Sequence, residues 1–143
     1  MAINFSKFDQ FSEDVAHKVH DLGSDQLRFY LTNATPSAAA DAVLLDLYPI
    51  ANGNGYTGPV ALVRDTSLQT SGVYKLVLDD PTTITATGGA IPPFRYVVIY
   101  NDTPTSPADP LIGWFDYGSQ INLAETQTFD IDLSAANGLL TIA

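Results

Sequence analysis

Apolar and polar residues alternate with a period of two along most of the chain beyond its N-terminal segment. The stretch 27–32 places Leu27, Phe29 and Leu31 on one face, and the stretch 129–133 places Asp130 and Asp132 on the face opposite its apolar residues. Such alternation predicts strands with one buried side and one solvent-facing side. The stretch 94–100 is apolar on both faces, which is typical of a strand in the centre of a sheet.

Turn-forming residues divide the rest of the chain into short segments. Ser71 and Gly72 predict a tight hairpin turn, and the Gly-, Asn- and Pro-rich stretches 51–59 and 101–110 predict surface loops. Further apolar runs and short strands are expected at 43–48, 60–64, 66–70, 74–78, 84–87, 111–117, 120–123 and 139–143, with a turn at Gly118 and Ser119. About nine short strands at this spacing predict an all-β fold, either an antiparallel β-sandwich or a jelly-roll-like barrel.

The N-terminal segment follows a different period. Apolar residues recur there at steps of three and four before Gly23, which predicts a short amphipathic helix over 7–21. An extended arm is the alternative, because bulky aromatic residues near a chain end would also suit docking onto another surface. The expected organisation is an N-terminal helix or arm over 1–25, packed on the domain or on a partner, and a β-sandwich domain over 26–143.

Composition and charge exclude several classes of protein. The chain has 143 residues, no cysteine and a formal net charge of −10. This length suits one domain, and the lack of cysteine removes thiolate metal sites and thiol nucleophiles. The few scattered basic residues make no cationic patch, so neither nucleic acid nor a membrane is expected as a partner. The N-terminus resembles no signal peptide, and no stretch reaches the ~18 apolar residues of a membrane span, so synthesis in a cytoplasm is expected.

Few residues point to chemistry. His17 and His20 have a spacing that would place both imidazoles on one side of a helix, but a zinc site needs three or four ligands in one shell. Asp102 and Asp109 lie in a Pro-rich loop that lacks the Asp-x-Asp-x-Asp-Gly pattern of a calcium loop. No serine stands in a nucleophile elbow. We therefore expect no enzyme, no catalytic residue, no metal and no cofactor.

An aromatic cluster is the best candidate for a ligand face. Trp114, Phe115 and Tyr117 follow closely on Tyr100 and Asn101 in the sequence. Exposed aromatic side chains beside polar groups are typical of sites on which small ligands such as sugars stack. Apolar residues fall on both faces of the stretch 111–117, however, so at least half of them are expected in the core.

Three stretches of the chain carry a family resemblance. They are VAHKVHDLGSDQLRFYLTN at 15–33, TSGVYKLVL at 70–78 and GGAIPPFRYVVIYNDTPTSPADPLIGWFDYG at 88–118, followed by the closing FDIDLSAANGLLTIA. Together they resemble a family of small virion structural proteins of tailed bacteriophages, over nearly the whole chain. Members of this family resemble capsid decoration, or cement, proteins, in which a β-sandwich lies on the outside of the head shell.

The resemblance implies a function without catalysis. The expected partner is the major capsid protein, whose subunits the protein would bridge, and the expected location is the outer capsid surface of the virion. A homo-oligomer, dimer or trimer, at local symmetry axes is also implied. Tail and neck proteins use compact β-sandwiches too, so a tail or neck position stays an alternative, as does a glycan-binding module on the virion surface that would use Trp114 and Tyr117.

The partner-binding residues expected from the sequence are aromatic residues near the N-terminus, residues of the two long loops, and the single tryptophan. They are Phe5, Phe8, Phe11, Asn52, Asn54, Tyr56, Asp102, Pro104 and Trp114.

Overall fold

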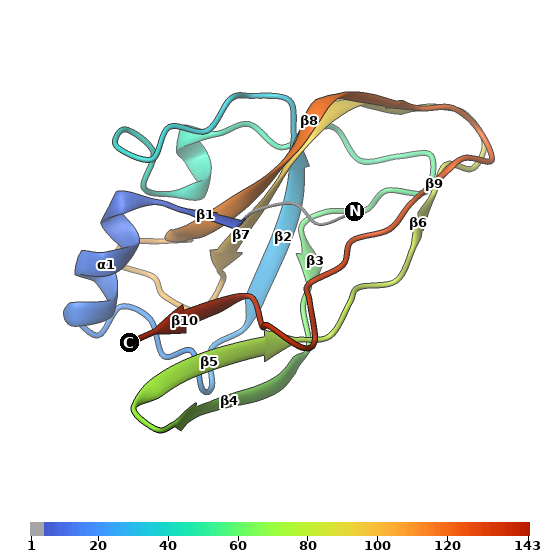
Figure 1. Cartoon of the computed structure of the whole chain (residues 1–143). Helices are drawn as coiled ribbons and strands as arrows, with labels where there is room; N and C mark the ends of the chain where they lie inside the picture. Colours follow the sequence, from blue (N-terminus) through green and yellow to red (C-terminus); the bar gives the residue numbers. More distant parts are fainter. Residues whose placement is uncertain (1–4) are drawn as a thin grey trace.

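The computed structural model describes residues 5–143, and in this part of the chain it is an all-β fold with antiparallel sheets and one short α-helix (Figure 1). A five-stranded sheet has the order β1-β8-β7-β2-β3, a three-stranded sheet the order β10-β5-β4, and a two-stranded ribbon pairs β6 with β9. The strands are β1 (Phe5–Lys7), β2 (Leu27–Thr32), β3 (Val60–Ala61), β4 (Arg64–Thr70), β5 (Val73–Leu78), β6 (Ile84–Thr85), β7 (Ile91–Asn101), β8 (Leu111–Leu123), β9 (Thr128–Phe129) and β10 (Leu140–Ile142). The helix α1 spans Asp9–Ala16, and a short 3-10 helix, η1, spans Leu44–Asp46.

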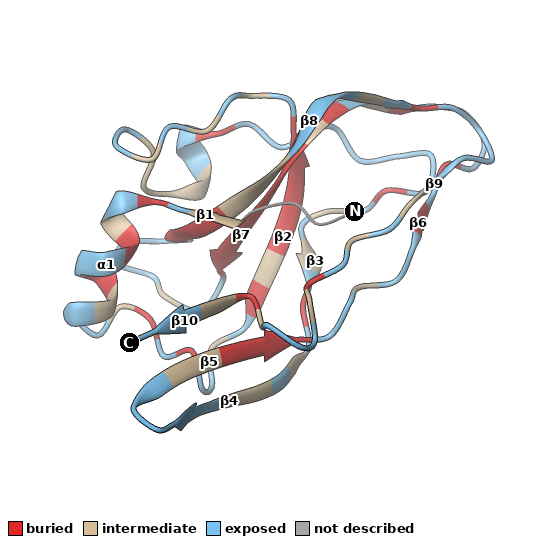
Figure 2. Ribbon diagram, in the orientation of Figure 1, coloured by how far each residue is buried: buried red, intermediate tan, exposed pale blue. Residues whose placement is uncertain are grey.

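The predicted central strand is confirmed. Strand β7 lies in the middle of the five-stranded sheet, with Val98 opposite Tyr30 of β2 and Trp114 of β8. Residues 96–101 of β7 are all buried (Figure 2). A strand covered on both faces must be apolar on both faces, which explains the pattern in its sequence.

The core lies on both faces of the five-stranded sheet. One face packs against the three-stranded sheet, so that Phe29 and Ile99 join Leu76 in a single apolar cluster. The opposite face carries a second cluster, in which Tyr30 and Val98 pack with Leu47 from the loop that follows β2. The β-sandwich expected from the sequence is therefore present, with an additional layer of loop on its outer face.

The N-terminal segment differs from the prediction. Residues 5–7 form strand β1, which pairs with β8, and the helix covers only Asp9–Ala16 instead of 7–21. The helix stops because Lys18 adopts a positive φ of 64° and Val19 N–H bonds to the carbonyl of Asp14. Residues 5–7 form backbone hydrogen bonds with β8 that would be lost if the helix began at Lys7. The local hydrophobic period cannot predict this pairing, because β8 is far away in the sequence.

Two turns show where local signals succeeded and failed. The β4–β5 hairpin is confirmed, with Ser71 and Gly72 at φ values of 54° and 84°, as its tight turn requires. The prediction of a turn at Gly118 is wrong, because β8 runs unbroken from Leu111 to Leu123. Gly118 lies within this strand with a φ of 99°. Glycine inside a strand also marks an irregular pairing, and the register between β7 and β8 shifts near this point.

Four other segments form less strand than the sequence predicts. In 60–64 residues 62 and 63 belong to no strand, and in 84–87 only Ile84–Thr85 does. The apolar run 43–48 contains the 3-10 helix η1 and no strand, since only Val43 makes an isolated bridge, to Pro110. In the stretch 129–133 only Phe129 belongs to a strand. Its burial still alternates as expected, with Asp130 and Asp132 exposed.

Candidate docking groove

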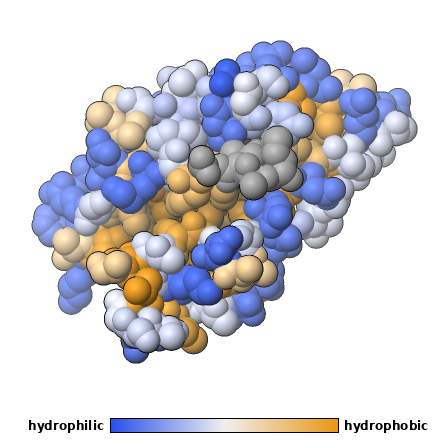
Figure 3. Space-filling view, in the orientation of Figure 1, coloured by the Kyte–Doolittle hydropathy of each residue, from blue (hydrophilic) through white to orange (hydrophobic). Residues whose placement is uncertain are grey.

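The sandwich is open along one side, where β1 and α1 stand apart from β10. The groove between them has a volume of about 470 Å³. Figure 3 shows apolar atoms gathered in this hollow, between the helix and the C-terminal strand. Its lining residues come from the two ends of the chain and are Phe5, Lys7, Phe11, Ser12, Val15 and residues 139–142.

The groove exists because two sheet edges meet there. Strand β1 is the outermost strand of the five-stranded sheet, and β10 is the outermost strand of the three-stranded sheet. Within residues 5–143, each of these two strands is hydrogen-bonded to another strand on one side only. Side chains that would be fully enclosed in a closed barrel stay partly accessible, and Ile142 is 40% exposed. An exposed strand edge with an apolar floor is a site that another chain can occupy.

The groove continues along α1. A second hollow of about 550 Å³ shares Val15 and Ile142 with the first, and it extends past Lys18 to Ser67 of β4 and Tyr74 of β5. The two hollows together form an elongated surface beside the helix. An elongated surface suits an extended segment of chain better than a compact ligand.

A buried polar cluster lies at the inner end of this surface. His20 has no exposed side-chain area, and its Nδ1 accepts a hydrogen bond of 3.1 Å from Nδ2 of Asn101. In neutral His20 the proton is therefore on Nε2, which faces Oδ2 of Asp14 at 4.0 Å, too far for a hydrogen bond. Burial lowers the pKa of His20, while the carboxylates of Asp14 and Asp25 act to raise it.

The two histidines do not share a site. The side chain of His17 is 67% exposed and stands 3.7 Å from Glu13, whereas His20 is buried. Among residues 5–143, no three His, Cys, Asp or Glu side chains are grouped closely enough to hold a metal ion. The spacing of His17 and His20 would place them on one face of a helix, but the helix ends at Ala16, so neither residue is in it.

Three of the residues expected to contact a partner are buried in the protein's own core. Phe8 is 0% exposed and Phe11 4%. Tyr56 is 1% exposed, and its hydroxyl oxygen accepts a hydrogen bond from the N–H of Leu31. The free chain therefore presents almost none of these three side chains at its surface, although Phe11 also lines the groove, and their contact with a partner stays a prediction. Residues 5–22 pack on their own domain and form no extended arm. Phe5 lines the groove as well.

The expected loop residues remain at the surface but lie outside the groove. Asn52 exchanges two hydrogen bonds with the backbone of Gly58, and Asn54 donates one to the carbonyl of Ala90. Asp102 forms an ion pair of 2.8 Å with Arg28. Pro104 is half-buried. Asn52, Asn54 and Asp102 thus each use side-chain polar atoms in contacts within the chain.

The aromatic cluster is split between two faces. Trp114 packs against Phe8, with ring centroids 4.6 Å apart, in the outer core cluster. Phe115 stacks beside Phe5 on the opposite face of β8, and Tyr117 points to that side, at 6.1 Å from Phe129. Trp114 and Tyr117 therefore cannot form the single stacking platform that the glycan hypothesis required.

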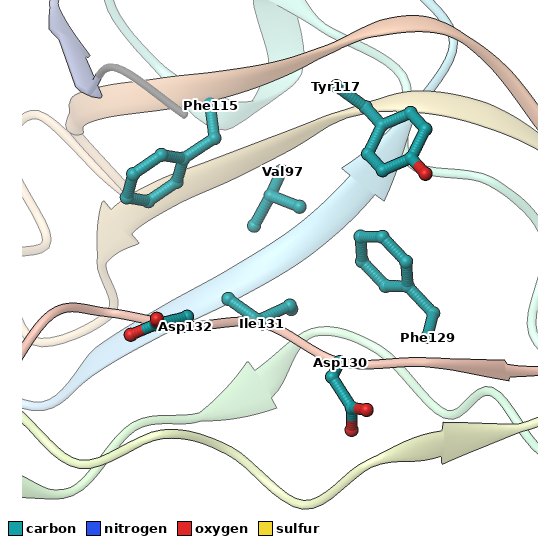
Figure 4. A pocket seen from close by; sticks show the side chains of 7 residues that line it. All are labelled: Val97, Phe115, Tyr117, Phe129, Asp130, Ile131 and Asp132. Atoms are coloured by element: carbon teal, nitrogen blue, oxygen red, sulfur yellow. The ribbon is translucent and has the colours of Figure 1, made fainter. Parts of the chain in front are cut away.

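A small hollow on the Tyr117 side is lined by aromatic and acidic residues, as a ligand site would be, but its carboxylates do not point into it. It measures about 70 Å³ and is lined by Val97, Phe115, Tyr117, Phe129, Asp130, Ile131 and Asp132. In Figure 4 the apolar side chains face one another, while the carboxylates of Asp130 and Asp132 point away from them. Asp130 instead accepts a hydrogen bond from the hydroxyl of Thr83. The hollow is a packing seam between the sheet and the segment that follows β9.

The sequence did not identify Lys7, Val15 and the stretch 139–142 as parts of one surface. The apolar run near the C-terminus predicted a closing strand, and β10 is that strand. The sequence did not show which strands lie beside β10. Whether a strand lies at the edge of a sheet depends on the sheet topology and not on the strand's own residues.

Comparisons of the chain with protein-family models, curated proteins and solved structures found no match. Within residues 5–143, no helix combines the length and the apolar character needed to cross a bilayer.

Proposed function

We propose that this chain is a non-enzymatic capsid decoration protein, which binds the outer surface of a tailed-phage head and bridges subunits of the major capsid protein. The proposal begins from the sequence resemblance over residues 15–33, 70–78 and 88–118. The observation that carries it further is the groove, an apolar surface between β1 and β10, the outermost strands of two sheets in an otherwise well-packed β-sandwich.

The groove offers binding energy to a neighbour. Phe5, Val15 and Leu140 are half-buried in the free chain, and Ile142 is 40% exposed. Covering such side chains contributes about 25 cal/mol for each Å² of apolar surface removed from water. A protein that binds the assembled shell and not its free subunits stabilises the shell by mass action. No bond-making group is needed for this role.

The charge of the chain agrees with an outer position. A net charge of −10 keeps the protein soluble before docking and repels it from packaged DNA. The outer core cluster and the loop after β2 cover the other face of the five-stranded sheet. The groove is a side of the sandwich on which two outermost strands, β1 and β10, border an apolar floor.

Reconstitution tests the proposal directly. Shells of the encoding phage, assembled without this protein, are mixed with the purified chain, and occupancy is measured by sedimentation and electron microscopy. We expect saturable binding and a raised melting temperature of the shell. Ile142→Glu in the groove should abolish occupancy, whereas Leu68→Glu, at a site that is 55% exposed on β4, should not.

Two results would contradict this assignment. If the wild-type chain does not bind shells, the proposed capsid role is wrong. If the two glutamate variants reach equal occupancy on shells, the groove is not the docking surface. The copy number in mature particles distinguishes the capsid shell from the tail or neck. Hundreds of copies indicate the shell, and about six to twelve indicate a ring of subunits in the tail or neck.

A further inference from the structure

We propose that Asn137 is a site of spontaneous modification, at which the side-chain amide is lost and the main chain is rerouted through the side chain as isoaspartate, which loosens strand β10. The reaction needs only water and no partner, so it does not depend on the docking role of the groove. Three features carry it: the glycine that follows Asn137, the free side chain of Asn137, and the contacts that restrain the other two Asn-Gly pairs of the chain.

An asparagine followed by a glycine holds both reactants of a ring closure. The backbone nitrogen of Gly138 attacks Cγ of Asn137, the Cγ–Nδ2 bond breaks, and the amide leaves as ammonia with the proton of the attacking nitrogen. Water then opens the five-membered imide and returns a proton to the Gly138 nitrogen. Opening at Cγ gives aspartate, and opening at the backbone carbonyl carbon gives isoaspartate. Either product replaces a neutral amide by a carboxylate that is ionised at neutral pH.

The fold requires glycine at position 138. Its φ is 76°, and a Cβ there would lie 2.7 Å from the carbonyl oxygen of Leu76 and 2.8 Å from Cγ of Lys75. A larger residue would strain the backbone and collide with β5. Glycine also hinders attack by its own nitrogen least, because it has no side chain. The packing of this turn against β5 therefore places the least hindered neighbour directly after Asn137.

The side chain of Asn137 is free to meet that nitrogen. Asn137 is exposed, and among residues 5–143 no hydrogen bond holds its amide group. The N–H of Gly138 donates to the carbonyl of Ser134 at 2.7 Å, so this bond must open before attack. Lys75 adds one exposed hydrogen bond of 3.2 Å to the turn. Residues 135–136 are exposed alanines, so opening the turn uncovers little apolar surface and costs little free energy.

The pair formed by Asn52 and Gly53 is restrained at both reacting groups. The amide of Asn52 exchanges two hydrogen bonds of 2.9 Å with the backbone of Gly58. The N–H of Gly53 donates to the carbonyl of Tyr56 at 2.8 Å, and Tyr56 is buried in the core. Ring closure here would require the loop to leave its anchor in the core.

The pair formed by Asn54 and Gly55 is held against a neighbouring segment. Nδ2 of Asn54 donates to the carbonyl of Ala90 at 2.8 Å, and its own carbonyl accepts from the N–H of Thr87 at 2.9 Å. Gly55 lies so close to Thr85 that a Cβ would fall 2.0 Å from the carbonyl oxygen of Thr85. The loop must detach from this segment before Asn54 can react.

Isoaspartate at this turn would disturb β10. It adds one methylene group to the main chain directly before Leu139, which is 6% exposed and whose N–H bonds to the carbonyl of Leu76 at 2.8 Å. The lengthened chain cannot keep both the close seat of Gly138 and this bond. Leu140 and Ile142 follow on β10 and line the groove, so the modification acts on that surface as well.

Ageing of the full chain tests the inference. The purified protein is incubated in mildly alkaline buffer, and peptide mapping by mass spectrometry with electron-transfer fragmentation follows the three asparagines. Asn137 should convert at least about tenfold faster than Asn52 and Asn54, which corresponds to an opening that costs about 1.4 kcal/mol less. In the urea-unfolded chain the three sites should convert at similar rates, because they share one dipeptide. Asn137→Gln should remove the product at this turn, since the longer side chain closes a ring far more slowly.

Amide hydrogen exchange tests the effect on β10. In the isoaspartate form, separated by ion exchange, exchange at Leu139 should accelerate. Freshly prepared Asn137→Asp adds the charge without the methylene group and should exchange as the wild type does. An unchanged rate at Leu139 in the isoaspartate form would overturn the loosening of β10.

Two outcomes of the ageing experiment would overturn the site itself. One is that Asn137 does not convert in the folded chain, and the other is that all three asparagines convert at equal rates in the folded chain. Neither measurement uses shells, so these outcomes leave the capsid role to its own test.

Discussion

Asn101, the last residue of β7, donates a hydrogen bond of 3.1 Å from its Nδ2 to Nδ1 of His20, which stands 81 residues earlier. The same amide nitrogen donates at 2.6 Å to Asp25, and the amide oxygen accepts from the N–H of Thr103. Asn101 is 0% exposed. One buried side chain thus fastens the N-terminal segment to the end of the central strand, directly behind the groove.

Loss of this amide should destabilise the protein strongly. In Asn101→Ala, the buried His20 and the half-buried Asp25 both lose a hydrogen-bond donor, so the free energy of unfolding should fall by about 2–4 kcal/mol. Urea unfolding measures it. Asn122→Ala is the matched control, because Asn122 is exposed on β8 and should change stability by less than about 0.5 kcal/mol. Similar losses in both variants would contradict the fastening role.

Acid should destabilise the folded chain through His20. Burial lowers its pKa below the ordinary value of 6.5, so the unfolded chain takes up a proton that the folded chain resists. The free energy of unfolding should therefore be at its full value above 6.5 and fall as the pH drops below it.

Urea midpoints from about pH 7.5 to about pH 5 measure this slope, in the range where histidine titrates. His20→Leu should flatten it, and His17→Leu, at an exposed position, should leave it unchanged. A slope that persists in His20→Leu would assign the effect to other groups.

Substitutions of Phe8 and Phe5 should have different effects, because Phe8 is a core residue and Phe5 lines the groove. Phe8→Ala empties a fully buried site beside Trp114 and should cost about 3–5 kcal/mol of stability. Phe5 is half-buried, so Phe5→Ala should cost only about 1–2 kcal/mol while lowering shell occupancy. Thermal unfolding and sedimentation with shells measure the two effects. A milder loss for Phe8 than for Phe5 would refute the assignment.

Gly113 should be essential for β1. A Cβ at this position would collide with the ring of Phe5 and with the carbonyl oxygen of Ser6. Gly113→Ala should therefore displace β1 from β8 and lower stability by about 1–3 kcal/mol. Amide exchange at Ser6, which is bonded to β8, should accelerate.

Gly23→Ala is the control for this variant, since the nearest atom to its Cβ would be Oδ1 of Asp21 at an ordinary 3.4 Å. Unchanged exchange at Ser6 in Gly113→Ala would show that β1 tolerates the methyl group.

The sequence predicted the elements whose signals are local. The double-sided apolar run of β7, the Ser71–Gly72 hairpin and the alternation around Asp130 and Asp132 were all readable, because strand burial and turn conformation act on neighbouring residues. The helix was placed correctly but made too long. A period of three to four continues through Val19, and only the positive φ at Lys18 ends the helix.

The candidate site was much less predictable than the fold. Aromatic character suggested Phe8, Phe11 and Trp114 as contacts, yet large apolar side chains serve a core as readily as an interface, and the first two are buried. The pairing of Trp114 with Tyr117 failed because their odd separation sends them to opposite faces of β8.

By itself, the sequence determined that this protein is all-β, acidic and free of cysteine, because these properties follow from residue counts and local periods. Only the tertiary structure decided that β1 and β10 are edges, that their apolar sides leave a groove, and that His20 meets Asn101. Each of these depends on contacts between residues far apart in the chain, such as Phe5 with Phe115 and Ile142 with Tyr74. Such pairings are chosen by the packing of the whole sandwich, and no short stretch of sequence encodes them.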